Sequence, residues 1–221
     1  DAHWIERMWG AFGSEHTPDV VSGFFHPSGA TFLERTIAFA TTPRLTEINP
    51  AAFSPSSRSV GFTRSAWSTA QGYPEWLDYC EDVVFDRALQ RTGHTFLFTP
   101  GAWVSWSARP TVRAFMIQYF RYARGDGKAG LWSRRHLARY TAYAAGTVLA
   151  SQSARRPWLV APLALAGAGY LRKTWLRIVL RRTAFGPGWF GAALLAPVIV
   201  IAGDIAKMAG YPAGVIWRSR R

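Results

Sequence analysis

The most constraining feature of this sequence is its last 95 residues, which combine a strong positive charge with long apolar runs. Residues 127–221 contain 15 Lys or Arg residues and a single acidic residue, Asp204. Residues 1–126 contain 11 basic and 12 acidic residues, so the net charge of +13 lies in the second part of the chain. This contrast predicts an ordinary folded domain followed by a region that lies on an anionic membrane surface.

Three apolar stretches divide the basic region: residues 140–154, 158–171 and 184–203. Only the third, with 20 residues, reaches the length that crosses a bilayer. Arg155 and Arg156 join the first two, and a spanning hairpin would put these charges on the far side of the membrane. We therefore expect an interfacial hairpin over residues 140–171, and the third stretch either spans the bilayer or lies on it. Asp204 and Lys207 stand one turn apart at its end and could pair. Burial of all three stretches inside a soluble domain is the alternative.

The arginines of this region interrupt apolar runs and do not line one polar face. No recognition motif for nucleic acid is present, so nucleic acid is not expected as a partner. Cys80 is the only cysteine, which excludes an intrachain disulfide and suits a reducing, cytoplasmic face. A small buried residue is the favoured role for Cys80, since no His lies near it in sequence to make it a nucleophile.

Residues 1–126 alternate between helical and strand patterns, which predicts an α/β layered domain. We expect this domain to cover residues 1–130 and the membrane-associated helices to cover residues 131–221. A turn at residues 124–127 is expected to end the neutral part. The expected helices cover residues 2–13, 31–40, 78–93 and 112–124, with another beginning at Arg64, and the expected strands cover residues 20–25, 56–63, 95–98 and 102–106. The large apolar residues of the first helix are expected on one face, and the helix over residues 78–93 is expected to bury an apolar stripe of Val84, Phe85, Ala88 and Leu89.

The third of these helices begins with a cluster of acidic residues. Asp78 is expected to cap the helix, with Glu81 completing a capping box, and Gly93 is expected to close it. Asp82 then lies in the first turn, where the helix dipole favours its ionised form by roughly 0.3 to 1 kcal/mol. An ionised carboxylate at this position fits a general base, although capping alone also explains acidic residues there.

A second candidate cluster lies on the helix that Thr111 is expected to cap. Gln118, Arg121 and Tyr122 stand at positions i, i+3 and i+4, so they share one face of the helix. Spacing alone favours a solvated face with a stacked Arg–Tyr pair, and a binding site is the alternative.

Taken in order, these segments resemble the carboxyl-terminal part of a family 2 glycosyltransferase of the GT-A type, over roughly residues 1–130. The pair Glu81-Asp82 resembles the acidic catalytic pair of that family. Residues 57–62 (Ser-Arg-Ser-Val-Gly-Phe) resemble its preceding strand, and residues 118–122 (Gln-Tyr-Phe-Arg-Tyr) resemble its Gln-x-x-Arg-Trp motif. The resemblance implies a Rossmann-like α/β fold and an inverting transfer of a sugar from a nucleotide-sugar donor to an acceptor hydroxyl.

The resemblance also implies roles for individual residues. Asp82 would take the proton of the acceptor hydroxyl, and Glu81 would orient it. Gln118 and Arg121 would hold the acceptor or the leaving diphosphate, with Arg58 as a further candidate for that anionic group. The remaining candidates for substrate binding are Ser59, Trp76 and Tyr122. Trp76 could stack on a sugar ring, and Tyr122 stands where the family has Trp.

The sequence departs from the family in its metal site. The resemblance implies magnesium or manganese, but the Asp-x-Asp ligands are absent from this chain, and Asp1-Ala-His3 is not a convincing substitute. Since the chain begins with Asp1 and shows no leader, we expect it to start within a domain and to be inactive alone. The acceptor would be lipid-linked or a saccharide, met at the cytoplasmic face of the cell membrane.

Two other functions fit the same residues. In a membrane-peripheral binding or scaffold module, the acidic pair is only a helix cap and the basic region recruits anionic lipid. In a carboxylate-pair hydrolase, Glu81 or Asp82 would act with Asp78 or Asp86. Acids this close on one helix rarely straddle a scissile bond at the roughly 5 to 10 Å that glycoside hydrolysis requires, so the hydrolase ranks last.

Overall fold

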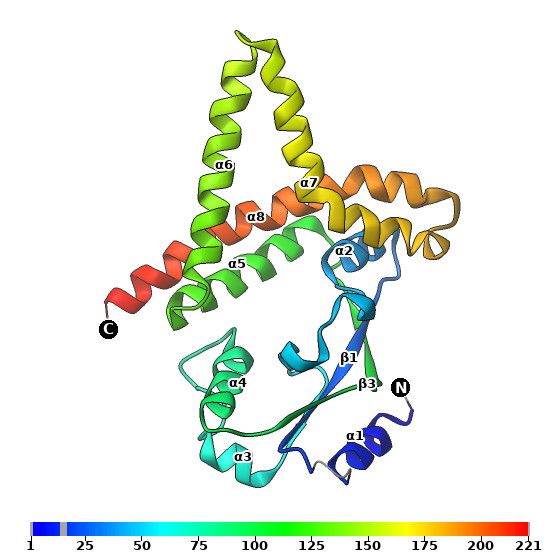
Figure 1. Cartoon of the computed structure of the whole chain (residues 1–221), viewed down its shortest axis with the longest axis vertical. Coiled ribbons are helices and arrows are strands. Elements are labelled where there is room, and N and C mark those ends of the chain that lie inside the picture. Colours follow the sequence, from blue (N-terminus) through cyan, green and yellow to red (C-terminus); the bar gives the residue numbers. More distant parts are fainter. Residues whose placement is uncertain (1, 14–16, 221) are drawn as a thin grey trace. The chain divides into compact units, whose positions relative to one another are not determined.

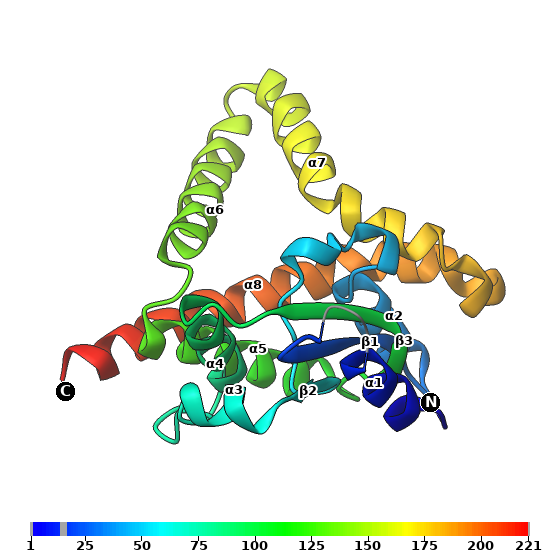
Figure 2. The same ribbon diagram turned by 60° about the horizontal axis from the view of Figure 1, so that its bottom comes forward.

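The computed structural model describes residues 2–13 and 17–220. Two compact units make up the chain (Figures 1 and 2). Unit 1 comprises Asp1–Gly29 and Thr42–Ala108, and unit 2 comprises Ala30–Thr41 and Arg109–Arg221. The predicted mixture of helices and strands is confirmed, and the strands all lie in unit 1.

Unit 1 is built on a three-stranded mixed sheet with the order β2-β1-β3. The central strand β1 (Val20–Ser28) pairs antiparallel with β2 (Val60–Phe62) and parallel with β3 (Phe96–Ser107). Val20, Val21 and Phe24 of β1 are at most 1% exposed, as expected for a central strand that is covered on both faces.

The prediction of two strands over residues 95–106 is wrong, because β3 is continuous through Pro100 and Gly101. The pairing of β3 with β1 shifts register between Ser22 and Phe24, and this irregularity accommodates the Pro-Gly pair. At Gly23 the backbone of β3 approaches so closely that a Cβ atom would lie 1.8 Å from the carbonyl oxygen of Ala102. The extra residues of β3 therefore bulge over a glycine.

The helices of unit 1 are α1 (Trp4–Phe12), α3 (Arg64–Thr69) and α4 (Glu81–Arg91), and two short 3₁₀ turns lie at Leu45–Glu47 and Pro50–Ala52. Thr63 caps α3 by accepting a hydrogen bond from the Ala66 amide. Met8 of α1 packs on Val21 and Ala102.

The expectation that one face of the first helix gathers all its large apolar residues is only partly right. Ile5 and Trp9 are 74% and 79% exposed. The face that packs on the sheet instead follows the spacing i, i+4, i+7 and i+8 and contains Trp4, Met8, Ala11 and Phe12.

Unit 2 is helical and consists of α2 (Phe32–Thr41), α5 (Val112–Ala129), α6 (Ser133–Ser153), α7 (Val160–Val179) and α8 (Trp189–Ser219). Short 3₁₀ turns at Pro157–Leu159, Arg182–Ala184 and Gly186–Gly188 connect the last three helices. The core beside α2 contains Ala40, Ile178, Ala192 and Ala196. In Figure 1, α5 runs alongside α8.

Small residues bring α5 and α8 into backbone contact, which corrects the predicted turn at residues 124–127. A Cβ atom at Gly127 would lie 2.3 Å from the Tyr211 carbonyl oxygen, and one at Gly210 would lie 2.2 Å from that of Phe120. Gly127, which was predicted to lie in a turn, therefore serves close helix packing, and α5 continues to Ala129. Gly130, with φ of 67°, ends the helix.

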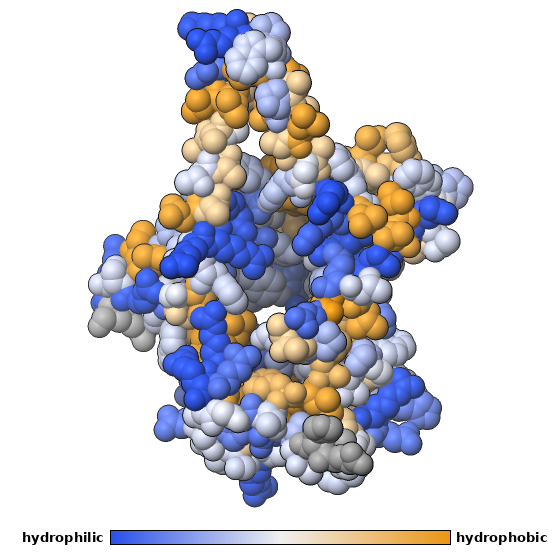
Figure 3. Space-filling view, viewed as in Figure 1, coloured by the Kyte–Doolittle hydropathy of each residue, from blue (hydrophilic) through white to orange (hydrophobic). Residues whose placement is uncertain are grey.

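The expected hairpin is formed by α6 and α7, which meet near Arg155 and Arg156 (Figure 1). Figure 3 shows hydrophilic residues at its tip above apolar patches on both helices. Among residues 2–13 and 17–220, one stretch, Gly186–Ser219, is long and apolar enough to cross a membrane, with mean hydropathy 1.9 and a third of its most apolar part buried. This observation supports membrane association without fixing a topology.

Candidate active site

The acidic cluster lies at the start of α4, but the helix begins differently from the prediction. The N-cap residue is Cys80, with φ of 66° in the left-handed region, and no side chain caps the helix. Asp78 lies outside the helix, so its predicted role as the cap is wrong. A non-glycine residue in this region costs roughly 1 to 3 kcal/mol, and such strained positions concentrate at functional sites.

The other end of α4 follows the prediction. The Gly93 amide donates to the Gln90 carbonyl (3.3 Å) and the His94 amide donates to the Leu89 carbonyl (3.1 Å). With φ of 80° at Gly93, this pair of bonds forms a Schellman motif. Phe85 and Leu89, expected on the apolar stripe, are at most 2% exposed. The C-terminal motif and the buried face therefore hold α4 in place.

Glu81 and Asp82 occupy the first turn of α4 and are half-buried. The Val83 amide donates to Asp82 Oδ1 at 2.9 Å. Asp82 is therefore partly accessible to solvent at the start of α4, where a substrate hydroxyl could reach its carboxylate.

Asp86, one turn later, is a third carboxyl, which the sequence suggested only as a partner in a carboxylate-pair hydrolase. It is 3% exposed, and the Ser54 hydroxyl donates to its Oδ2 at 2.9 Å. Burial, together with the negative charge of Asp82, raises the pKa of Asp86 to about 7, although the Ser54 hydrogen bond lowers it. The only signal in the sequence is the i, i+4 spacing from Asp82, which places both carboxyls on one side of the helix.

Tyr73 lies close to all three carboxyls. Burial raises the pKa of its phenol, and the negative charges of Asp86, Asp82 and Glu81 raise it further, against a lowering hydrogen bond from Ser57. Its ring packs edge-on and tilted within an aromatic cluster formed by Phe62, Trp67, Tyr73 and Phe85. The acidic corner therefore has a rigid aromatic wall and a protonated phenol.

The other candidates of unit 1 differ in how accessible they are. The Arg58 guanidinium lies over the rings of Phe25 and Trp106, 5.1 Å from each centroid, and donates to the Ser56 hydroxyl at 2.9 Å. Trp76 is 45% exposed.

Ser59 is 1% exposed and its hydroxyl is engaged within the protein. It accepts from the Trp4 indole N–H (2.9 Å) and donates to the Ala102 carbonyl (3.0 Å). These two bonds tie α1 and β3 to the residue that precedes β2.

The polar triplet belongs to unit 2, on α5. Thr111 caps this helix as predicted, since its hydroxyl accepts from the Ala114 amide at 3.1 Å. Gln118 is only 6% exposed, and its Nε2 donates to the Tyr122 hydroxyl at 2.7 Å, whereas Arg121 is exposed. The Gln118 Oε1 atom is buried without a hydrogen-bond partner among the described residues. The triplet therefore does not form a simple solvated face.

The structure groups the candidates by unit. Glu81 and Asp82 share the first turn of α4 in unit 1, which also contains Arg58, Ser59 and Trp76, and the triplet lies in unit 2. Within 2–13 and 17–220, no three His, Cys, Asp or Glu side chains come together as a possible metal site. Magnesium or manganese therefore stays an expectation from the resemblance.

A second polar cluster, inside unit 2, surrounds Asp204 of α8. The Arg139 Nε atom donates to Asp204 Oδ1 at 2.9 Å, and the hydroxyls of Tyr143 and Tyr170 donate to Oδ2. The expected pairing with Lys207 is present at 3.8 Å. Asp204 is 3% exposed, so these contacts compensate a buried charge and connect α6 and α7 to α8.

Comparison with known proteins does not identify the chain: no family model, no curated protein and no solved structure matches it.

Proposed function

We propose that this chain is the acceptor-binding and catalytic part of an inverting glycosyltransferase at the cytoplasmic face of a membrane. The observation that carries the proposal is the pair of carboxyls on one side of α4, Asp82 and Asp86. Asp82 is partly accessible in the first turn, and Asp86 is buried with a raised pKa. A carboxyl with a strongly perturbed pKa next to an accessible carboxyl marks a candidate acid–base site.

In the proposed reaction, Asp82 removes the proton from the acceptor hydroxyl as its oxygen attacks the anomeric carbon of the donor sugar. The bond from that carbon to the nucleoside diphosphate breaks, and the diphosphate leaves with the bonding electrons. Attack from the face opposite the leaving group inverts the anomeric configuration. Glu81, adjacent in the first turn, orients Asp82 or the acceptor.

Gln118 and Arg121 are proposed to bind the acceptor or the leaving diphosphate. The unpartnered Oε1 atom of Gln118 can accept a hydrogen bond from a sugar hydroxyl, which would satisfy a buried polar atom. The exposed guanidinium of Arg121 suits the charge that develops on a diphosphate. Tyr122, bonded to Gln118, fixes the orientation of its amide.

The membrane location rests on the charge and hydropathy of unit 2. An anionic cytoplasmic leaflet attracts basic segments by about 1 kcal/mol per Lys or Arg near its surface, and 15 such residues lie in residues 127–221. A site held at this surface would meet a cytoplasmic nucleotide-sugar and a lipid-linked or saccharide acceptor. A divalent metal is expected from the resemblance alone, and no step above depends on it.

Sugar transfer tests the proposal directly. Membranes from cells that express the natural gene would be offered a panel of labelled nucleotide-sugars, with Asp82→Asn and the control Glu75→Gln beside the wild type. Glu75 is an exposed carboxylate that precedes α4, so its neutralisation changes the charge without changing the proposed base. We expect one donor to be consumed by wild type and control, and at least a hundredfold slower transfer by Asp82→Asn.

The alternative function is a membrane-peripheral binding module without catalysis, favoured by the basic charge of unit 2. It predicts that no donor is consumed, or that Asp82→Asn transfers sugar at the wild-type rate while binding to anionic vesicles persists. Either result would reject catalysis at this carboxyl.

A further inference from the structure

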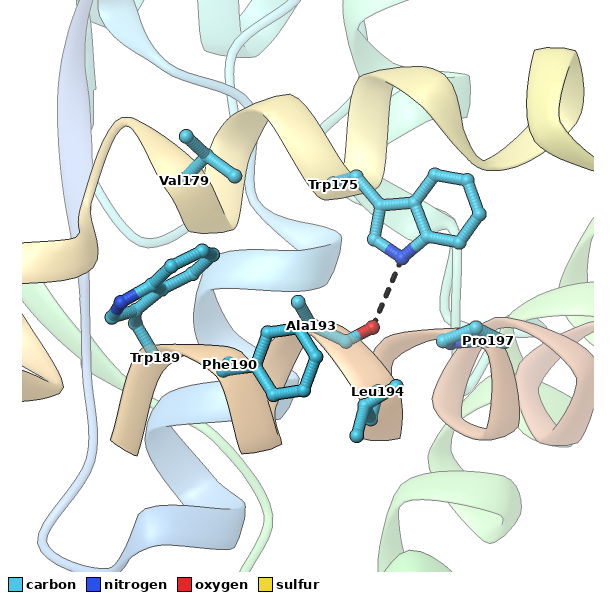
Figure 4. A pocket seen from close by; sticks show the side chains of 7 residues that line it. All are labelled: Trp175, Val179, Trp189, Phe190, Ala193, Leu194 and Pro197. Carbon is cyan, nitrogen blue, oxygen red and sulfur yellow. Dashed lines mark hydrogen bonds between the residues drawn. The ribbon is translucent and has the colours of Figure 1, made fainter. Parts of the chain in front are cut away.

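An apolar cleft of about 280 Å³ lies between the end of α7 and the start of α8, within unit 2 (Figure 4). Its walls are formed by Trp175, Val179, Trp189, Phe190, Leu194 and Pro197. Figure 4 shows the indole nitrogens of Trp175 and Trp189, and the Trp175 N–H donates to the Ala193 carbonyl at 2.9 Å. The cleft is lined by apolar and aromatic side chains and fits a hydrocarbon chain better than a polar ligand.

The cleft opens onto surface that a membrane lipid can reach. Phe190 and Leu194 are 61% and 65% exposed although they are large apolar residues. Both belong to the Gly186–Ser219 stretch that is apolar enough to cross a membrane. Exposed apolar side chains around a concave site mark a binding surface, and on this helix the bilayer is the nearest source of apolar ligand.

The turn that joins the two walls carries positive charge. Arg182 follows Val179 by three residues, begins the 3₁₀ turn before α8 and is exposed. The neighbouring Arg181 is engaged elsewhere, since it donates to the Phe39 carbonyl at 3.4 Å and lies over the Phe39 ring.

Acidic residues do not offset this charge from the surrounding helices. The sequence contains none between Asp126 and Asp204. The carboxylate of Glu34, on the adjacent α2, accepts hydrogen bonds from the backbone amides of Ala30 and Thr31, which immediately precede that helix. An apolar cleft whose connecting turn carries an exposed arginine is complementary to an amphiphile with a negative head group.

We propose that the α7–α8 cleft is a binding site for an anionic phospholipid, with part of one acyl chain between Trp175 and Leu194 and the phosphate at Arg182. The site would fix unit 2 in a leaflet rich in anionic lipid. It is independent of sugar transfer, so the proposed function and this site can fail separately.

The test counts lipids retained by the purified protein. The protein, in its natural form, is reconstituted in nanodiscs of phosphatidylcholine with phosphatidylglycerol, extracted in mild detergent and analysed by native mass spectrometry. We expect phosphatidylglycerol to be retained in preference to phosphatidylcholine. Arg182→Gln should weaken this retention about tenfold, as for loss of one charge-assisted hydrogen bond. Ala193→Phe, which fills the cleft, should abolish it.

Two matched controls separate the site from general effects of charge and hydrophobicity. Arg172→Gln removes the same charge from an exposed position on α7, and Ala168→Phe adds the same ring to its exposed surface. Both should retain phosphatidylglycerol as wild type does, with circular dichroism confirming the fold of every variant. The assignment would be overturned if Arg182→Gln and Arg172→Gln retained equal amounts of phosphatidylglycerol, or if wild type retained both lipids equally. Displacement of phosphatidylglycerol by a polyprenyl phosphate would also overturn it.

Discussion

The buried carboxyl of Asp86 makes a quantitative prediction about stability. A carboxyl with a pKa of about 7 in the folded protein and 3.8 when unfolded binds its proton more tightly in the folded state. Its contribution to stability is therefore fully present below pH 3.8 and is lost as pH rises toward and through 7. Each pH unit of difference corresponds to about 1.4 kcal/mol, so the whole shift amounts to roughly 4 kcal/mol.

Between pH 5 and pH 8, this single group should lower the free energy of unfolding by about 2 to 3 kcal/mol. Asp86→Asn removes the titration but keeps an oxygen that can accept the hydrogen bond from Ser54. The variant should therefore lose the pH-dependent decrease and be more stable than wild type at pH 8.

Urea unfolding followed by tryptophan fluorescence, at pH 5, 6, 7 and 8, measures this difference. The quantity compared is the free energy of unfolding of Asp86→Asn minus that of wild type, because titration of all other groups cancels in it. Glu75→Gln, which neutralises an exposed carboxylate, should show a constant difference from wild type. A constant difference for Asp86→Asn as well, or a variant less stable than wild type at pH 8, would refute the reasoning.

Two further predictions concern the packing of each unit. In unit 2, Gly210→Ala forces a Cβ atom to 2.2 Å from the Phe120 carbonyl oxygen and should destabilise the protein by at least about 1 to 3 kcal/mol. The control Gly146→Ala, whose Cβ atom would have no atom within 4 Å, should stabilise the protein by up to about 1 kcal/mol. Thermal unfolding in detergent distinguishes the two variants. In unit 1, Asp19 accepts from the Thr95 amide and hydroxyl at 2.8 and 3.0 Å, and these bonds lower its pKa. Asp19→Ala should lower the free energy of unfolding by about 1 to 3 kcal/mol at pH 7. The loss should be smaller below pH 3.8, because wild type then loses the ionised form of Asp19, and measuring the free energy of unfolding at a series of acidic pH values checks this.

Local sequence signals identified most helices and strands because each acts over a few residues. The alternation of apolar and turn residues located β1 and α2, and the side chains of Thr63 and Thr111 begin α3 and α5. The errors arose where long-range packing overrode a local signal. Gly127 appeared to be a turn residue because nothing near it in sequence indicates that the backbone of α8 lies against it.

The candidate site shows the same limit. The i, i+4 spacing placed Gln118 and Tyr122 on one face of α5, where the structure shows them hydrogen-bonded to each other. Spacing could not show which side of α5 is covered, and so it did not predict that Gln118 is 6% exposed. The raised pKa of Asp86 likewise depends on its burial, which the pattern of α4 does not reveal. Its hydrogen-bond partner Ser54 lies 32 residues earlier in the chain.

The cluster around Asp204 indicates how a longer-range inference could have been made. The i, i+3 spacing predicted only Lys207 as a partner, yet Arg139 lies nearer, at 2.9 Å, from a helix 65 residues earlier. An unpaired carboxylate inside an apolar helix is costly, so the only acidic residue among 95 mostly apolar and basic ones must find a cation or several hydroxyls. Arg139 and Tyr143 stand at i and i+4, so one face of α6 presents both to a single acceptor. The requirement to neutralise a buried charge therefore predicts contact between α6 and α8, although neither helix signals it by its own pattern.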